Sequence, residues 1–195
     1  MIEFLNYIDT QLFLFFNAML ANTVFDWLMP VITDKHTWYP VWIILIVGLG
    51  WKGGARGRFA LLIAILAVAV TDSTIHHYLK PFFNRIRPCN VVEGAHLLMG
   101  KKSSLSMPSA HAANFFAVAS VFAYFYRRYQ VIFWFLAAMV AYSRVAVGVH
   151  YPFDVLAGAL YGTVISYLWI YAIHYALKPF DRSLPQPHSS AVDKT

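Results

Sequence analysis

The chain alternates long apolar runs with short polar hinges. Apolar residues fill most of the segments 38–51, 59–78, 112–126, 131–149 and 152–177, and glycine, proline or charged residues lie between them. Apolar runs of about 15 to 26 residues have the length of membrane-spanning helices. The pattern therefore predicts an all-α fold, a polytopic membrane bundle of about six helices in which residues 1–178 make one domain.

The first 36 residues carry a mixed pattern. The stretch 12–32 is long enough to cross a bilayer but contains Asn17, Asn22 and Asp26. Apolar side chains recur there at helical spacing, which fits either a broken span or two helices lying at the membrane interface. We therefore divide the chain into residues 1–36, a helical core at 37–178 that holds the candidate chemistry, and a polar tail at 179–195 with a composition typical of disorder.

Composition narrows the class of protein. With 59% hydrophobic and only 12% charged residues, the chain departs from soluble averages and is interpreted as an integral membrane protein whose partner is the lipid bilayer. The net charge of +6 is spread over separate hinges and forms no continuous patch, so nucleic-acid binding is not indicated. The single cysteine, Cys89, excludes an intrachain disulfide. No cleavable signal peptide is evident at the start, and the oligomeric state cannot be inferred.

The basic hinges predict an orientation. Those at 52–58 and 127–128, with Lys178 and Arg182 at the start of the tail, fall on one side if the spans alternate, and the positive-inside rule makes that side cytoplasmic. Residues 80–108 and the hinge 148–152 then share the outer face. Because the 80–108 segment is itself basic, it breaks the rule, and an anionic ligand is the simplest reason.

The first polar cluster spans residues 80–88. It holds Lys80, Arg85 and Arg87, and ammonium and guanidinium groups together suit a phosphate. Alone, the cluster is explained as well by basic side chains reaching the headgroups at the end of a span. Asp72 and Lys80 fall on one helical face, so Asp72 is expected to orient Lys80 or to pair with another polar group.

The second cluster is Ser106-Met107-Pro108-Ser109-Ala110-His111, immediately before an apolar helix. Ser109 is a good helix N-cap, and the free amides and dipole of a helix start attract anions. An ordinary capped helix with His111 facing the headgroups is the alternative. Asn114 lies one turn further on and is a possible hydrogen-bond partner of His111.

The third cluster runs from Ser143 to Asp154, where two apolar runs meet. Ionisable residues at such a place are costly and indicate function. Arg144 suits a phosphate clamp, His150 a nucleophile or base, and Asp154 the group that sets the tautomer of His150. Pro152 suits a first helical turn, which places Asp154 about one turn from the imidazole. If the spans alternate, all three clusters lie on the same side of the membrane.

The three clusters together resemble a known signature. In order they read K-x6-R-P, P-S-x-H and S-R-x5-H-x3-D over residues 80–154. This combination resembles the type 2 phosphatidic acid phosphatase family, which includes vanadate-dependent haloperoxidases and glucose-6-phosphatase. The resemblance implies an acid phosphatase/vanadium haloperoxidase-like helical core. It extends loosely to residue 177, while residues 1–36 and the tail lie outside the motifs.

The resemblance also implies roles for individual residues. His150 would attack phosphorus and become a phosphohistidine, Asp154 would accept its other N–H, and His111 would protonate the leaving oxygen and later activate water. The non-bridging oxygens would be bound by the following groups: Lys80, Arg87, Ser109, the Ala110 amide and Arg144. The family commonly has glycine at position 110, but alanine keeps the backbone N–H.

The expected activity is that of a metal-independent lipid phosphatase in the bacterial inner membrane, with its site facing the periplasm. No metal or cofactor is implied, because the cationic residues repel metal ions and His150 with Asp154 lacks further ligands. We expect undecaprenyl diphosphate, the carrier precursor of cell-wall synthesis, as substrate; phosphatidylglycerophosphate, phosphatidate and lipid A phosphates stay open. The alternatives are a polyprenyl-phosphate binding or transport protein and a vanadate-dependent haloperoxidase, which the apolar runs disfavour.

Overall fold

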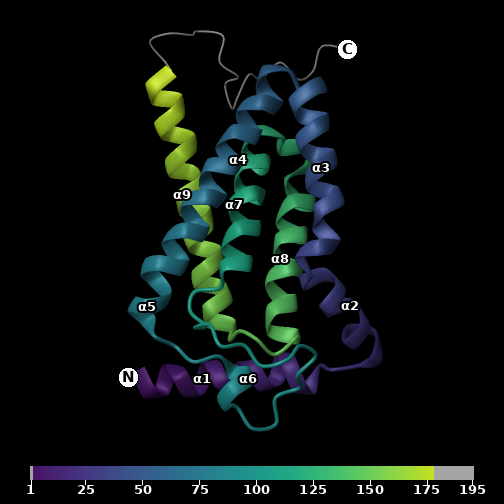
Figure 1. The fold of residues 1–195 in the computed structure, drawn as a ribbon, viewed down its shortest axis with the longest axis vertical. Coiled ribbons are helices and arrows are strands. Elements are labelled where there is room, and N and C mark those ends of the chain that lie inside the picture. Colours follow the sequence, from purple (N-terminus) through teal and green to yellow (C-terminus); the bar gives the residue numbers. More distant parts are fainter. Residues whose placement is uncertain (1, 178–195) are drawn as a thin grey trace.

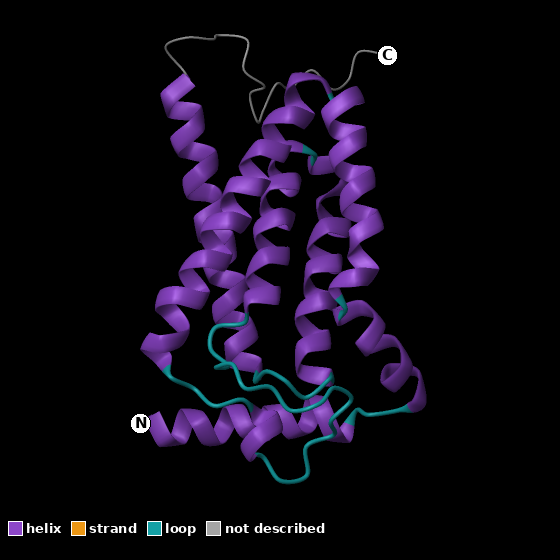
Figure 2. Cartoon of the chain, viewed as in Figure 1, coloured by secondary structure: helices purple, strands orange, loops and turns teal. Residues whose placement is uncertain are grey.

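The computed structural model describes residues 2–177, which form helices and loops without strands (Figure 2). The long helices run side by side along the molecule (Figure 1). They are α3 (Lys35–Lys52), α4 (Gly54–Thr74), α7 (Ala110–Phe125), α8 (Gln130–Ala146) and α9 (Pro152–Leu177). The predicted all-α bundle is confirmed, with α9 beginning at Pro152 as expected. The predicted disordered tail lies outside the described residues.

Short elements gather at the ends of the bundle. They are α1 (Ile2–Leu14), α2 (Thr23–Thr33), α5 (Lys80–Phe83), α6 (Pro88–Val91), the π-turns Phe15–Met19 and Ile75–Leu79, and a 3₁₀ turn, Arg127–Tyr129. The α3–α4 and α7–α8 turns lie at one end. The α5–α7 segment and the α8–α9 hinge lie at the other end, with α1 across it (Figure 1). The spans alternate as the sequence predicted.

Residues 2–33 form a bent pair of helices. The first segment, Glu3–Met19, meets Thr23–Thr33 at 114°. The side chain of Asn22 caps α2 by accepting from Val24 and Phe25 N–H. Asn17 is buried and its Nδ2 donates to the main-chain oxygens of His96 and Ala146, both at 2.8 Å. The polar residues that made this region ambiguous therefore break the helix or fasten it to the bundle.

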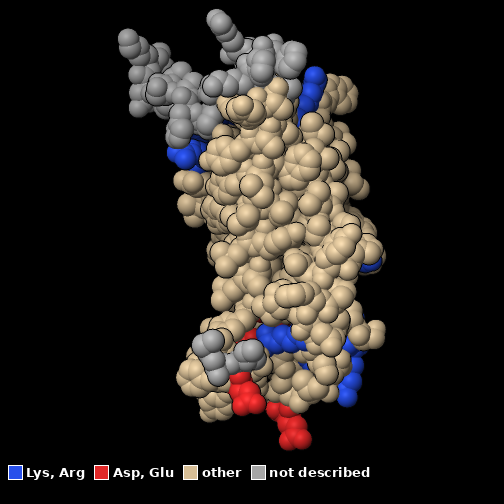
Figure 3. Space-filling model, turned by 90° about the vertical axis from the view of Figure 1, so that its left-hand side faces the viewer, with Lys and Arg blue, Asp and Glu red and all other residues tan. Residues whose placement is uncertain are grey.

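The sides of the bundle are apolar. Among residues 2–177, three helical segments are long and apolar enough to cross a membrane: Gly54–Val91, Arg127–Ala146 and Pro152–Ala176. The bent pair would make a fourth if it is counted as one span. Large apolar side chains such as Leu160, Val164 and Leu168 stand exposed on α9. On the face shown in Figure 3, uncharged residues dominate the middle and charged ones gather toward the ends. The chain is a multi-pass membrane protein.

Helix α7 lies at the centre and packs on α4, α8 and α9. Its contact with α9 is made backbone to backbone at Gly158 and Gly162. A Cβ at Gly158 would lie 2.3 Å from the Ser109 oxygen, and one at Gly162 would lie 2.0 Å from the Ala113 oxygen. Small residues at this spacing let membrane helices approach closely. The approach brings the start of α7 beside the start of α9, where Ser109 N–H donates to the Asp154 main-chain oxygen at 2.9 Å.

Candidate active site

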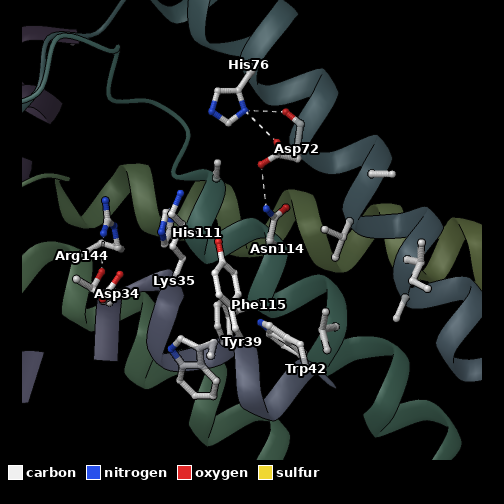
Figure 4. A pocket seen from close by; sticks show the side chains of 18 of the residues that line it. Asp34, Lys35, Tyr39, Trp42, Asp72, His76, His111, Asn114, Phe115 and Arg144 are labelled. Atoms are coloured by element: carbon white, nitrogen blue, oxygen red, sulfur yellow. Dashed lines mark hydrogen bonds and ion pairs between the residues drawn. The ribbon is translucent and has the colours of Figure 1, made fainter. Parts of the chain in front are cut away.

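A cavity of about 860 Å³ opens between α2, α3, α4 and α7 and reaches the α8–α9 hinge. In Figure 4, Arg144, His111 and Asn114 lie along the lining of this cavity. One part of the lining is apolar and includes Trp38, Trp42, Ile65 and Phe122. The polar part contains predicted site residues from separate elements: Lys80, Arg87, Ala110, His111, Arg144 and His150.

His150 lies in the hinge, and its side chain is only 2% exposed. Its Nε2 is 2.9 Å from Arg87 Nη1. A guanidinium group only donates, so Nε2 accepts and the ring proton lies on Nδ1, which faces Asp154 Oδ2 at 3.4 Å. Burial, with help from the charges of Arg87 and Arg144 and against the pull of Asp154, lowers the pKa of His150 below its usual value. The ring is therefore neutral at pH 7, with a lone pair on Nε2.

Asp154 is fully buried at the start of α9. Its Oδ1 accepts from Arg85 Nη1 at 2.7 Å, and its Oδ2 accepts from Tyr151 N–H at 2.9 Å and from the Ser106 hydroxyl. These bonds fix the carboxylate and so fix the orientation of the His150 ring. Ser106 and Arg85 belong to the predicted clusters, but no local pattern predicts their contact with Asp154.

Asp9 of α1 extends this network. It is fully buried, its Oδ2 lies 2.7 Å from Arg85 Nη1, and its Oδ1 accepts from Phe153 N–H at 2.9 Å. Arg85 also stacks over the Tyr151 ring at 4.0 Å. Sequence reasoning missed Asp9, although a carboxylate flanked by Ile8 and the apolar residues that follow was a usable signal. The N-terminal helix is thus joined to the site through one buried ion pair.

Removing the Asp9 carboxylate should destabilise the protein strongly. Asp9→Ala leaves Arg85 with one carboxylate in place of two and leaves Phe153 N–H without its acceptor. Breaking a buried ion pair lowers the free energy of unfolding by about 3–5 kcal/mol. Denaturant unfolding of the purified protein measures this loss. Glu3→Ala, which changes an exposed carboxylate of the same helix, is the matched control. Equal effects of the two substitutions would contradict a structural role for Asp9.

Three buried cations face the cavity. Lys80 is 5% exposed and donates to the Leu105 oxygen at 2.9 Å, which leaves two of its N–H groups unused. Arg87 is anchored on the Ser104 and Val149 oxygens. Arg144 donates to the Thr33 hydroxyl, and its buried Nε has no partner within residues 2–177.

None of these cations forms an ion pair with a carboxylate in the described part of the chain. Burying unpaired charge is expensive, so a pocket of this kind suits a strongly anionic ligand. The planar guanidinium groups and the ammonium group match the oxygens of a phosphate.

The start of α7 supplies the remaining predicted residues. Ser109 is the N-cap of this helix, as expected, and its Oγ accepts from Ala112 N–H at 3.5 Å. It is fully buried beneath the cavity lining, whereas Ala110 and His111 lie in the lining itself. The structure thus places Lys80, Arg87, Ala110, His111, Arg144 and His150 around one space, with Ser109 and Asp154 directly behind it.

Of the sequence predictions about neighbouring residues, the one for Asn114 is wrong, and one of the two alternatives for Asp72 is confirmed. Asn114 does not bond His111; its Nδ2 donates to Asp72 Oδ1 at 3.0 Å. Asp72 thus pairs with another polar group, and Lys80 donates to the Leu105 oxygen instead.

Comparison with known proteins shows the family of the chain. The family model of the PAP2 superfamily matches residues 59–178. The chain is 32% identical to the lipid A 4'-phosphatase of Bacteroides thetaiotaomicron over 98% of its length and 88% of the relative. It is 32% identical to the undecaprenyl-diphosphatase of Sulfolobus acidocaldarius over 69% of its length and 62% of the relative. The crystal structure of Aquifex aeolicus LpxE matches with a TM-score of 0.69 and 25% identity, covering 83% of this chain and 93% of that one.

Proposed function

The chain belongs to the PAP2 superfamily and is a membrane lipid phosphatase, and from this premise we propose that it works through a phosphohistidine formed on His150. The observation that carries the proposal is the tautomer: Nε2 of His150 accepts from Arg87 and so carries a lone pair at the cavity. A nucleophile needs such a lone pair, together with a partner that holds the other ring nitrogen. Asp154 is that partner.

The first step transfers the phosphoryl group to the enzyme. Nε2 of His150 forms a bond to phosphorus while the bond from phosphorus to the lipid oxygen breaks, and His111 donates a proton to that oxygen. The ring becomes positively charged, and Asp154 stabilises it through the Nδ1 proton. In the second step water attacks phosphorus, His111 takes the proton of the water, and the P–N bond breaks to release inorganic phosphate.

The transferred group carries its negative charge on three non-bridging oxygens. We assign these oxygens to the free donors of Lys80, Arg87 and Arg144, with the Ala110 amide at the start of α7 as a further donor. Donors fixed before the reaction lower its barrier without having to reorganise. Ser109 acts here through the helix start that it caps rather than by direct contact.

For the substrate we propose a phosphomonoester of a lipid A-type glycolipid. The similarity to lipid A 4'-phosphatase runs over 98% of the chain. It therefore includes residues 1–36, which supply Asp9 to the His150 network and Thr33 to Arg144. Undecaprenyl diphosphate, the substrate expected from the sequence, becomes the second candidate, supported by similarity to an undecaprenyl-diphosphatase over 69% of the chain.

A phosphate-release panel tests the proposal. Purified protein is incubated with lipid A, undecaprenyl diphosphate, phosphatidylglycerophosphate and phosphatidate, each with and without excess chelator. Release should be fastest from lipid A, unchanged by chelator, and inhibited by vanadate as a phosphate mimic. Faster release from undecaprenyl diphosphate would overturn the substrate assignment. A protein that binds these lipids but releases no phosphate would be a carrier, and bromide oxidation dependent on vanadate would indicate a haloperoxidase.

We also propose that the catalytic end faces the periplasm, because the basic α3–α4 and α7–α8 turns lie at the opposite end (Figure 1). Cysteine labelling tests this orientation. In cells with a permeabilised outer membrane, an impermeant maleimide should label Ser103→Cys in the α6–α7 loop but not Ala55→Cys in the basic turn. Both positions are exposed, and the native Cys89 is buried and gives a low background. The reverse labelling would contradict the orientation.

A further inference from the structure

A second polar cluster lines the cavity beyond the phosphate-binding cations. It consists of Asp72 on α4, His76 on the following π-turn and Asn114 on α7, and it is called the Asp72 cluster below. Figure 4 shows its three side chains in a row, with Asn114 next to His111. The proposed phosphoryl transfer uses none of them. Charged and polar groups among apolar transmembrane helices are costly, which makes a binding role the first hypothesis.

Contacts within the Asp72 cluster determine which of its atoms can still accept a hydrogen bond from a ligand. Asn114 Nδ2 donates to Asp72 Oδ1 at 3.0 Å, and the Nδ1 of His76 lies 2.8 Å from the main-chain oxygen of Asp72. That oxygen only accepts, so the His76 proton lies on Nδ1 and its Nε2 is left as an acceptor. The side chains of His76 and Asp72 are 47% and 51% exposed. The Asp72 Oδ2 lies 3.6 Å from His76 Nδ1, beyond hydrogen-bond distance, so it and the His76 Nε2 remain as acceptors in the cavity lining.

These acceptors restrict what can be attached to the phosphate. A polyprenyl chain begins as hydrocarbon directly after the phosphate oxygen, so it would cover the Asp72 carboxylate without giving it a hydrogen bond. A second phosphate would bring like charge close to that carboxylate. A sugar ring instead offers hydroxyl and amide N–H donors close to its phosphate. The Asp72 cluster thus favours a sugar phosphate over a polyprenyl diphosphate.

The apolar part of the cavity fits the rest of such a lipid. Trp38 and Trp42 of α3 pack against Phe115 of α7, with ring centroids 4.9 and 5.5 Å apart. Both tryptophans and Phe115 line the cavity with aliphatic residues of α3 and α4. The cavity therefore combines cations, acceptors and an apolar surface, and a phosphorylated sugar carrying acyl chains offers a group for each of the three.

We propose that Asp72, held by Asn114 and His76, is the subsite that binds the sugar ring bearing the scissile phosphate. The proposal rests on the phosphatase function proposed above and deepens it, since it names the residue that selects glycolipid phosphates. The bound ring donates a hydroxyl or amide hydrogen bond to the Asp72 carboxylate. Asp72 does not contact the reacting atoms and is a specificity-determining residue.

The test compares two substrates on each variant. Asp72→Asn keeps the shape and the bond from Asn114 but replaces the free acceptor by a donor. It should lower kcat/KM about tenfold for lipid A and less than twofold for phosphatidate, which has no sugar. His76→Ala should act in the same direction, while His77→Ala is the matched control. His77 is the next residue on the turn, is exposed, and bonds the Ser73 oxygen at 2.9 Å.

Binding measurements separate this inference from the proposed reaction. Quenching of Trp38 and Trp42 fluorescence reports lipid binding whether or not phosphate is released. Asp72→Asn should weaken lipid A binding about tenfold and leave phosphatidate binding unchanged. Equal losses for both lipids, or no loss for either, overturn the subsite. Failure of the wild-type protein to release phosphate would instead refute the proposed function, while the ratio of binding constants still decides the subsite.

Discussion

His150→Ala is expected to lower phosphate release by about 10⁴-fold or more on every lipid tested, because it removes the nucleophile itself. The Nε2 lone pair faces Arg87 at the cavity, and no neighbouring group in the described residues replaces it with the same support from a buried carboxylate. Water would have to attack directly, without an enzyme-bound intermediate. A phosphate-release assay on purified protein measures the loss.

Two controls make this result specific to His150. The variant should unfold at a similar denaturant concentration, since Arg85, Ser106 and Tyr151 N–H continue to hold Asp154. His174→Ala changes a half-buried histidine near the end of α9 and should keep full activity. Rapid quenching with alkaline detergent and radiolabelled substrate should trap an acid-labile, base-stable phosphoenzyme in the wild type and none in His150→Ala. A phosphoenzyme in that variant would refute the assignment.

The part of the site that the sequence predicted is the part encoded in short segments. Lys80, His111, Arg144 and His150 stand out because an ionisable residue at the edge of an apolar run has few structural explanations. The i to i+4 spacing of His150 and Asp154 also fixes their contact locally, whatever the rest of the fold. The alternation of spans then brings the separate clusters to one end.

What the sequence did not predict depends on contacts between distant segments. Asp9 and Thr33 reach the site only because the bent α1–α2 pair packs against the catalytic end, and neither carries a local motif. The π-turn after α4 was equally unpredictable from the sequence. Assigning residues four apart to one helical face assumes α-helical geometry throughout the segment. In the structure Asp72 accepts from Asn114, and Lys80 donates to the Leu105 oxygen.

The effect of His111→Ala should depend on the leaving group. Lipid alkoxides are poor leaving groups and need a proton, so loss of the acid should slow their release by about 10²–10⁴-fold. An activated ester such as p-nitrophenyl phosphate leaves without a proton, so its transfer to His150 should be much less affected. Hydrolysis of the phosphohistidine still needs a base for the water, and that step should stay slow.

The variant should therefore accumulate phosphoenzyme with the activated ester. Stopped-flow absorbance should show a burst of p-nitrophenolate of about one equivalent per active site, followed by a slow steady state, and quenching with alkaline detergent should recover the adduct. Asn114, one turn along the same face of α7, bonds Asp72, so Asn114→Ala is the matched control and should give no such burst. If His111→Ala slows the two esters equally and leaves no adduct, His111 only binds the phosphate. The proton transfers would then belong to another group at the cavity, with the lysine of α5 as the next to test.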